Sequence, residues 1–131
     1  MTSFDALLIR VRQCTLCAAY LTDGTRPIVQ IQPSAKLLII GQAPGRKVHE
    51  SGIPFNDASG NRLRQWLGIS SDIFYDENKI AIVPMGFCYP GKGKSGDLPP
   101  RPECAPQWHA QLLSHLSQLQ LTLLIGQYSQ N

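Results

Sequence analysis

One short turn in the first third of the chain has the residue types that form the floor of a ligand site. Residues 37–40 are an apolar run typical of a buried strand, and the glycines and proline of residues 41–45 break that run into a tight turn. In an open α/β sheet, ligands bind just beyond the carboxyl ends of the strands, so this turn is a candidate site. Phe55 follows in another loop bounded by glycine and proline, where an aromatic ring can serve as a stacking face.

The four cysteines form a second candidate site. Cys14 and Cys17 make a C-x-x-C pair, whereas Cys88 and Cys104 stand singly in or beside predicted loops. Four thiolates can hold zinc or an iron–sulfur cluster, although one pair with two distant single cysteines is less typical of structural zinc. A redox-active C-x-x-C pair and buried free thiols are the alternatives, and the spacing alone leaves all of them open.

The composition is that of an ordinary globular domain. The 131 residues are enough for one domain with its own core, and 43% of them are hydrophobic. The net charge of +3 is compatible with nucleic-acid binding. There is no apolar run of membrane-spanning length and no secretion signal, so we expect a cytoplasmic monomer without a membrane partner. In a reducing compartment, four cysteines favour a metal or free thiols over disulfides.

Hydrophobic periodicity predicts the elements that would position these residues. Helices are expected over 4–11, 59–67 and about 103–119, and strands over 36–40, 79–84 and 121–125. The segments 23–33 and 89–102 are predicted to be loops. Leu63, Trp66 and Leu67 are expected to share the buried face of their helix.

The alternation of strands and helices predicts the fold class α/β, in three α/β/α layers around a central, mostly parallel sheet. We find neither an internal repeat nor a linker, so residues 1–131 are expected to form a single domain. The chain ends at residues 127–131, where a further helix ought to begin. We therefore expect the domain to be incomplete at its C-terminus.

Four motifs occur in order along nearly the whole chain. They are Cys14 and Cys17, the turn Gly41-Gln42-Ala43-Pro44-Gly45, the loop Gly52-Ile53-Pro54-Phe55 ahead of Ser59-Gly60, and Cys88 and Cys104 flanking Pro99-Pro100-Arg101-Pro102-Glu103. This ordered set resembles the uracil-DNA glycosylase superfamily, and most closely its family 4, the iron–sulfur branch. Each motif alone is weak, whereas the ordered set is specific.

The resemblance implies a hydrolase that takes a base out of the DNA stack and cleaves its N-glycosidic bond. It implies that Phe55 stacks on the flipped base, that Gln42 places the attacking water, and that the turn contacts base and sugar through Gly41, Ala43, Pro44 and Gly45. The four cysteines would hold a [4Fe-4S] cluster, with zinc as the less favoured metal. The implied partner is DNA containing uracil or another damaged base.

The sequence departs from the family pattern in three places. Gln42 replaces a glutamate, and an amide can hold a water but cannot accept a proton. Pro84 stands where the family places the asparagine that contacts the uracil edge. A His-Pro-Ser-Pro-like loop would lie beyond residue 131, so we expect this chain alone not to carry full activity.

Other side chains are candidates to replace the missing groups. Asn56 and Asp57 follow Phe55, and Asp57 is the nearest candidate catalytic carboxylate, with capping of the helix near residue 59 as its alternative role. His49 is either a site residue or a solvated loop histidine. His109 and His115 are predicted to be surface residues.

The basic residues near the turn are candidates for DNA contacts. Arg46 and Lys47 flank it and are predicted to meet DNA phosphates, which position a protein without reading sequence. Lys92 and Lys94, in a glycine-rich loop, are either phosphate contacts or solvated charges. A P-loop is excluded, because only three residues separate the two glycines of the turn and the Lys-Ser/Thr ending is missing.

Three hypotheses follow. The first is a DNA glycosylase-like hydrolase that excises uracil or a related base. The second is a uracil- or DNA-binding module with a structural iron–sulfur cluster, made catalytically weak by Gln42 and Pro84. The third, a redox protein that uses the cluster, ranks last because such clusters look structural in this family.

Overall fold

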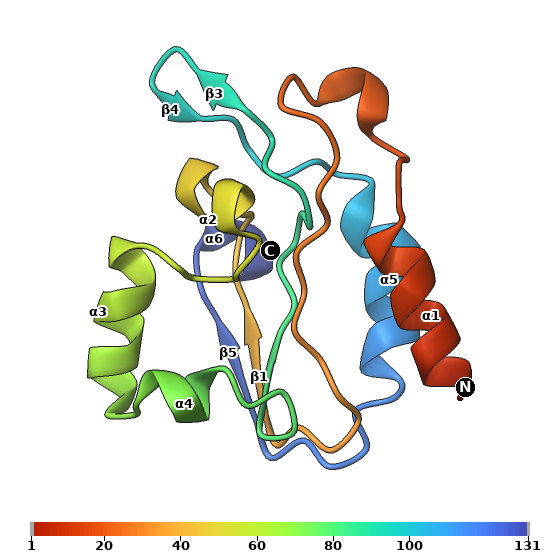
Figure 1. Cartoon of the computed structure of the whole chain (residues 1–131), viewed down its shortest axis with the longest axis vertical. Helices are drawn as coiled ribbons and strands as arrows, with labels where there is room; N and C mark the ends of the chain where they lie inside the picture. The colour runs from red at the N-terminus through yellow and green to blue at the C-terminus, as the bar shows by residue number, and fades with distance from the viewer. Residues whose placement is uncertain (1, 131) are drawn as a thin grey trace.

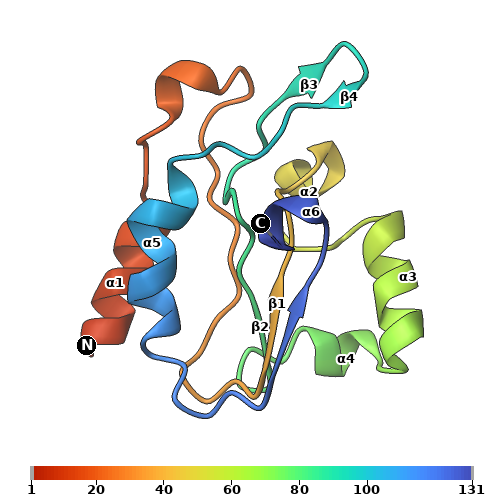
Figure 2. The same ribbon diagram turned by 180° about the vertical axis from the view of Figure 1, so that it is seen from behind.

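The computed structural model describes residues 2–130 and has a sheet of three parallel strands at its centre (Figure 1). The strand order is β2-β1-β5, with β1 at Leu37–Ile40, β2 at Ile80–Ile82 and β5 at Leu121–Leu124. On one face lie α1 (Ser3–Arg12) and α5 (Cys104–Leu113), and on the other lie α3 (Ala58–Leu67) and α4 (Ser71–Phe74) (Figures 1 and 2). The predicted three-layer α/β fold is confirmed.

The alternation of side chains along the strands divides the core between the two faces. Leu38 and Ile40 of β1 pack in the cluster that includes buried residues of α1 and α5. Ile39 packs in the other cluster, with Leu63 of α3 and Phe74 of α4. Successive residues of a strand point to opposite faces, so an apolar run such as 37–40 is required when helices cover both sides.

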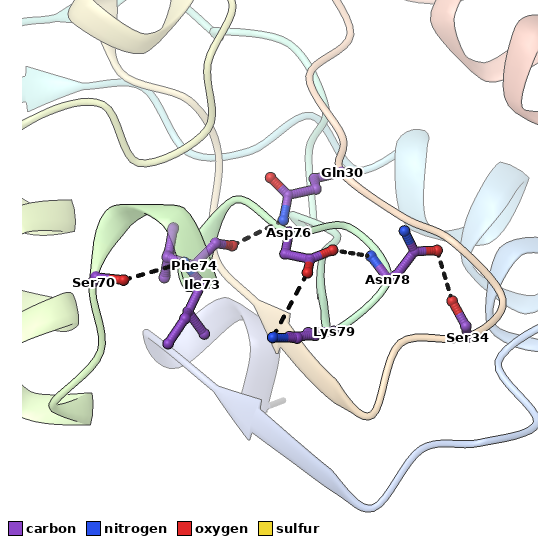
Figure 3. Close-up of polar contacts among 8 residues, drawn as sticks. All are labelled: Gln30, Ser34, Ser70, Ile73, Phe74, Asp76, Asn78 and Lys79. Carbon is purple, nitrogen blue, oxygen red and sulfur yellow. Dashed lines mark hydrogen bonds and ion pairs between the residues drawn. The ribbon is translucent and has the colours of Figure 1, made fainter.

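The outer edge of β2 is closed by an extended segment inside the predicted loop 23–33. Gln30 pairs antiparallel with Ile82 through backbone hydrogen bonds of 3.0 Å and 2.6 Å. Its buried side-chain amide donates to the carbonyl oxygen of Phe74 at 3.0 Å (Figure 3). The same amide also donates to the carbonyl oxygen of Ile80 at 2.9 Å. A buried amide is costly unless it is hydrogen-bonded, and these contacts fix the segment against the sheet.

Polar side chains lock the turn that precedes β2, at the amino end of the sheet. The backbone N–H of Asn78 donates to Asp76 Oδ1 at 3.1 Å, and Ser34 Oγ donates to Asn78 Oδ1 at 2.9 Å (Figure 3). Lys79 forms an ion pair with Asp76 at 3.9 Å. The polar side chains of this turn are therefore bonded to one another.

Two helices begin and end as their sequences indicate. The side chain of Thr2 and that of Asp5 form a capping box at the start of α1. Asp57 caps α3, and Gly68 ends it in a left-handed conformation. None of the helices within residues 2–130 is both long and apolar enough to cross a bilayer.

Several local predictions were wrong. Trp66 is 78% exposed rather than buried, and α5 ends at Leu113 although Leu116 remains in the core. The predicted loop 89–102 contains a hairpin of two short strands.

The elements that the periodicity did not predict are short: η1 (Ala18–Tyr20), α2 (Arg46–Ser51), α4, and the hairpin strands β3 (Lys92–Gly93) and β4 (Gly96–Asp97). The helix expected after β5 does begin there, as α6 (Gln127–Gln130).

Candidate active site

A cavity of about 230 Å³ opens at the carboxyl ends of the strands, where α2, α6 and the β3–β4 hairpin gather (Figure 1). It is smaller than the roughly 300 Å³ at which pockets for drug-sized ligands begin, which suits a ligand of one or two rings. The whole turn 41–45 lines it, together with Phe55, Asp57, Ser59, Pro84 and Gly126. Asn56 is exposed and is not among its lining residues.

Backbone hydrogen bonds hold the turn beyond the end of β1. The N–H of Met85 donates to the carbonyl of Gly41, and the N–H of Gly86 donates to that of Gln42, both at 2.9 Å. A Cβ placed on Gly41 would lie 3.3 Å from the ring of Phe55, closer than most side-chain contacts. Glycine at this position therefore lets the aromatic ring lie against the turn.

Gln42 connects the turn to the end of β5. Its side chain lies so close to Gly126 that a Cβ on that glycine would be 2.6 Å from the Gln42 amide oxygen. Gln42 is nevertheless exposed, at the rim of the cavity. Its amide can both donate to and accept from a water at this rim.

Phe55 has a backbone conformation that is unusual for its residue type. Its φ of +57° is the only positive φ of a non-glycine residue within residues 2–130. This conformation costs roughly 1–3 kcal/mol, so surrounding contacts must enforce it. A Cβ on Gly60 would overlap the carbonyl oxygen of Phe55, so α3 passes under this loop only because residue 60 is glycine.

Arg64, on α3, holds the Phe55 loop through hydrogen bonds. It is only 8% exposed, and its guanidinium donates to the carbonyl of Phe55 at 3.3 Å and to Tyr75 Oη at 3.1 Å. Tyr75 Oη in turn donates to the carbonyl of Pro54 at 2.8 Å. Burial raises the pKa of Tyr75, which keeps the phenol protonated as this hydrogen bond requires. The guanidinium also lies 5.0 Å from the centre of the Phe74 ring.

Sequence reasoning missed Arg64 and Tyr75. The available signal was the spacing of Gly60, Leu63, Arg64 and Leu67, which places the arginine on the apolar face of α3. A charge on that face needs buried partners, and the carbonyl of Phe55, the hydroxyl of Tyr75 and the ring of Phe74 supply them.

Asp57 has the capping role that we considered for it. Its Oδ1 accepts the N–H of Gly60 at 2.9 Å, which orients the carboxylate at the cavity wall. A catalytic role for Asp57 stays a prediction.

A protein-family model matches most of the chain. The family model described as the uracil DNA glycosylase superfamily matches residues 28–131. The chain belongs to this superfamily. The match covers the turn, the Phe55 loop, Cys88 and Cys104, and it begins after Cys14 and Cys17.

In this superfamily member, the four cysteines line a second cavity, between α5, the segment of residues 14–27 and the chain after β2. Phe87, Arg101 and Trp108 complete much of its wall, and none of the cysteines forms a disulfide. The cavity measures about 10 Å³, which is room for one water. No three His, Cys, Asp or Glu side chains in the described part of the chain are gathered tightly enough to hold a metal ion.

Three of the four thiols lack the lowered pKa of a reactive cysteine. Burial raises the pKa of Cys88 and of Cys104 to about 11, and it also raises that of Cys17. Reactive thiols have a lowered pKa, because the thiolate is the nucleophile. Beside them, Arg101 donates to both carboxylate oxygens of Glu103, at 3.1 Å and 2.8 Å.

One buried group in this cavity has no partner. Trp108 is 8% exposed, and its indole Nε1–H makes no hydrogen bond within residues 2–130. Leaving a buried donor unsatisfied costs about 1–3 kcal/mol.

His109 and His115, predicted to be surface residues, are half-buried and make contacts within the chain. His109 Nε2–H donates to the carbonyl of Pro84 at 2.8 Å, and its ring stacks on Phe87 at 5.8 Å. Burial lowers the pKa of His109, so the neutral ring is favoured. His115 is half-buried, with its ring edge-on to Phe4. Through His109, α5 contacts the walls of both cavities.

His49 and Arg46 have protein partners rather than only solvent. The ring of His49 lies against Tyr89 at 5.7 Å, and its Nδ1 is buried without a hydrogen bond in the described chain. Arg46 pairs with Asp23 at 3.4 Å and lies over the Tyr89 ring.

Three lysines at this end of the molecule are exposed. Lys47, Lys92 and Lys94 make no ion pair within the part of the chain that the structure describes. The hairpin that carries two of them reaches the cavity turn, because a Cβ on Gly45 would lie 3.6 Å from Asp97 Oδ2.

Proposed function

We propose that this protein is a DNA glycosylase that removes uracil or a related damaged base by hydrolysing its N-glycosidic bond. The observation that carries the proposal is Phe55, held in a strained conformation at the wall of a cavity that is sized for one base. Membership of the uracil DNA glycosylase superfamily supports the same reaction class. A glycosylase must hold a flipped base in such a pocket, with an aromatic ring stacked on it.

In the proposed reaction, the base enters the cavity and stacks on Phe55, and Gln42 positions a water at the rim. As the glycosidic bond breaks, positive charge grows on the sugar and negative charge grows on the leaving base. Asp57 is the carboxylate of the cavity wall, so it stabilises the sugar cation and accepts a proton from the water. Its Oδ1 already accepts from Gly60, which leaves Oδ2 for this role.

A binding module without catalysis is the second candidate. Two observations favour it: Gln42 cannot accept a proton, and Pro84 presents no side-chain hydrogen bond to the base edge. Such a protein would hold uracil-containing DNA and release no base.

Base release from single-stranded DNA containing uracil tests both candidates, with Gln42→Glu and Asp57→Asn measured alongside. Asparagine also caps helices well, so Asp57→Asn removes the charge and keeps α3. We expect release by the unmodified chain at less than full activity, and a further fall of about 100-fold with Asp57→Asn if Asp57 is the base. Tight binding without release in the unmodified chain, with recovery in Gln42→Glu, would establish the binding module. No preference for uracil-containing DNA would refute both.

We further propose that the exposed lysines near the cavity contact DNA phosphates. Lys92 and Lys94 extend on a hairpin that reaches the turn, and Lys47 lies on α2 directly after it. Unpaired cations at the rim of a base cavity suit a negatively charged backbone on either side of a flipped nucleotide.

We also propose that the four cysteines hold an iron–sulfur cluster, as in the family 4 branch. The donor set fits: four free thiols line one cavity, and a buried indole N–H in its wall has no acceptor. Cys14, Cys17, Cys88 and Cys104 would hold the cluster.

The cluster, when bound, would tie the N-terminal C-x-x-C segment to the loop of Cys88 and the start of α5. Iron and acid-labile sulfide analysis of the anaerobically purified chain tests this, with zinc measured in the same sample. Four irons and four sulfides per chain are expected. One zinc per chain, or no metal, would overturn the cluster and leave the glycosylase proposal standing. A thiolate-held cluster also fits a reducing, cytoplasmic location.

A further inference from the structure

Trp108 is the buried group for which the fold gives no partner. It lines the cysteine cavity, it is 8% exposed, and its Nε1–H has no hydrogen bond within residues 2–130. We propose that this N–H donates a hydrogen bond to a sulfur of the cluster, either an inorganic sulfide or a cysteine thiolate. The inference rests on the cluster proposed above.

The position of Trp108 on α5 brings it to the cluster side. Cys104 opens this helix, and residues four apart on a helix lie one above the other on the same face. The indole therefore shares its face of α5 with one of the four ligands. Phe87 and Leu21 complete apolar parts of the wall.

The chemistry of the acceptor completes the argument. A neutral thiol accepts hydrogen bonds weakly, whereas thiolate and sulfide carry negative charge and accept strongly. The unsatisfied donor is therefore costly in the empty cavity and is satisfied when the sulfurs are ionised by iron. A hydrogen bond to sulfur stabilises the more negative, reduced cluster, so Trp108 raises the reduction potential.

The chain contains a matched control for this proposal, because it has two tryptophans and the other is Trp66. Trp66 lies on α3, across the sheet from the cysteines, and is 78% exposed (Figure 1). Trp108→Phe removes the N–H and retains an aromatic ring, and Trp66→Phe makes the same chemical change away from the cavity.

The test is the midpoint potential of the cluster in the anaerobically purified chain and in both variants. We expect a shift to more negative potential in Trp108→Phe and no shift in Trp66→Phe. Equal potentials in the two variants, at equal iron content, would overturn the proposal. Absence of iron from all three proteins would refute the cluster itself, and with it this inference, independently of base release.

A second measurement covers the case in which Trp108→Phe assembles no cluster. In the Trp66→Phe chain, Trp108 gives the single indole N–H signal in proton NMR. A hydrogen bond to the cluster predicts a paramagnetically shifted signal that exchanges slowly with solvent. An unshifted signal at the same position with and without iron would overturn the proposal.

Discussion

The two cavities of this protein are built in opposite ways. The cavity at the carboxyl ends of the strands is about 230 Å³, and contacts within the chain fix its walls. The cysteine cavity is about 10 Å³, and its wall holds four free thiols and an unpartnered indole N–H. The first cavity is preformed, as suits a ligand that binds and dissociates. The second has the thiols that the proposed cluster would need.

The two cavities differ in which of their groups are energetically unfavourable. At the cavity beyond the strand ends, the strain is in the backbone of Phe55. Contacts with Gly60, Arg64 and Tyr75 enforce it. At the cysteine cavity the cost is an unsatisfied indole donor, and burial raises the pKa of the thiols of Cys88 and Cys104 beside it. Substitutions at the first site should therefore act with or without metal, and substitutions at the second only when metal is bound.

The largest effect is expected from Cys104→Ser. Removing one proposed ligand should abolish most of the stabilisation by the proposed cluster, because metal binding and folding are coupled and such binding is worth several kcal/mol. Thermal unfolding of iron-loaded and iron-free samples measures it, with Ser114→Ala further along the same chain segment as the control. An equal melting temperature for the iron-loaded variant and the iron-loaded parent would contradict the structural role.

Gly60→Ala should be the most damaging change at the base cavity. The new Cβ would overlap the carbonyl of Phe55, so the loop or α3 must move, at a cost of about 3 kcal/mol. Gly68→Ala is the matched control, because Gly68 has a φ of +68° with open space around it. Left-handed strain alone costs that variant about 1 kcal/mol. Urea denaturation compares the two, and equal losses would show that the contact with Phe55 is unimportant.

The sequence predicted the parts of this molecule that follow from local patterns. The apolar runs at residues 37–40 and 80–83 are strands because their alternating side chains fill two separate clusters. The Gly/Pro turn lines a cavity because strand ends in parallel sheets meet at one edge. The ordered motifs predicted the superfamily, which the family match confirms.

What the sequence did not predict depends on contacts between distant segments. Trp66 and Arg64 are neighbours on the same helix, yet the charged residue is buried and the aromatic one is exposed. The reason is that the carbonyl of Phe55 passes over Gly60 and fixes which face of α3 is covered. His109 was placed on the surface because nothing local indicates that the carbonyl of Pro84, beyond the end of β2, lies beside α5.

A smaller effect is expected from Tyr75→Phe. It removes the hydroxyl that donates to Pro54 and accepts from Arg64, at a cost of about 1 kcal/mol. Because this hydroxyl holds the Phe55 loop, we also expect several-fold weaker binding of uracil-containing DNA. Tyr20→Phe is the control, since Tyr20 is 60% exposed and lies at the cysteine end. Equal binding by both variants would mean that the loop keeps its conformation without Tyr75.

The smallest effect on folding, and the sharpest on DNA, is expected from Lys92→Gln combined with Lys94→Gln. Both lysines are exposed on the hairpin beside the cavity, so their loss should leave stability unchanged. Each phosphate contact contributes about 0.7 to the salt dependence of single-strand binding, so the slope of log K against log salt should fall by about 1.4. Lys36→Gln with Lys79→Gln is the matched control, because these residues lie just before β1 and β2, at the opposite end of the sheet.

The hairpin pair should weaken binding to uracil-containing and undamaged strands equally, since phosphates carry no base information. An unchanged slope would remove the hairpin from the DNA interface, and a loss confined to uracil-containing strands would move it from the backbone to the base.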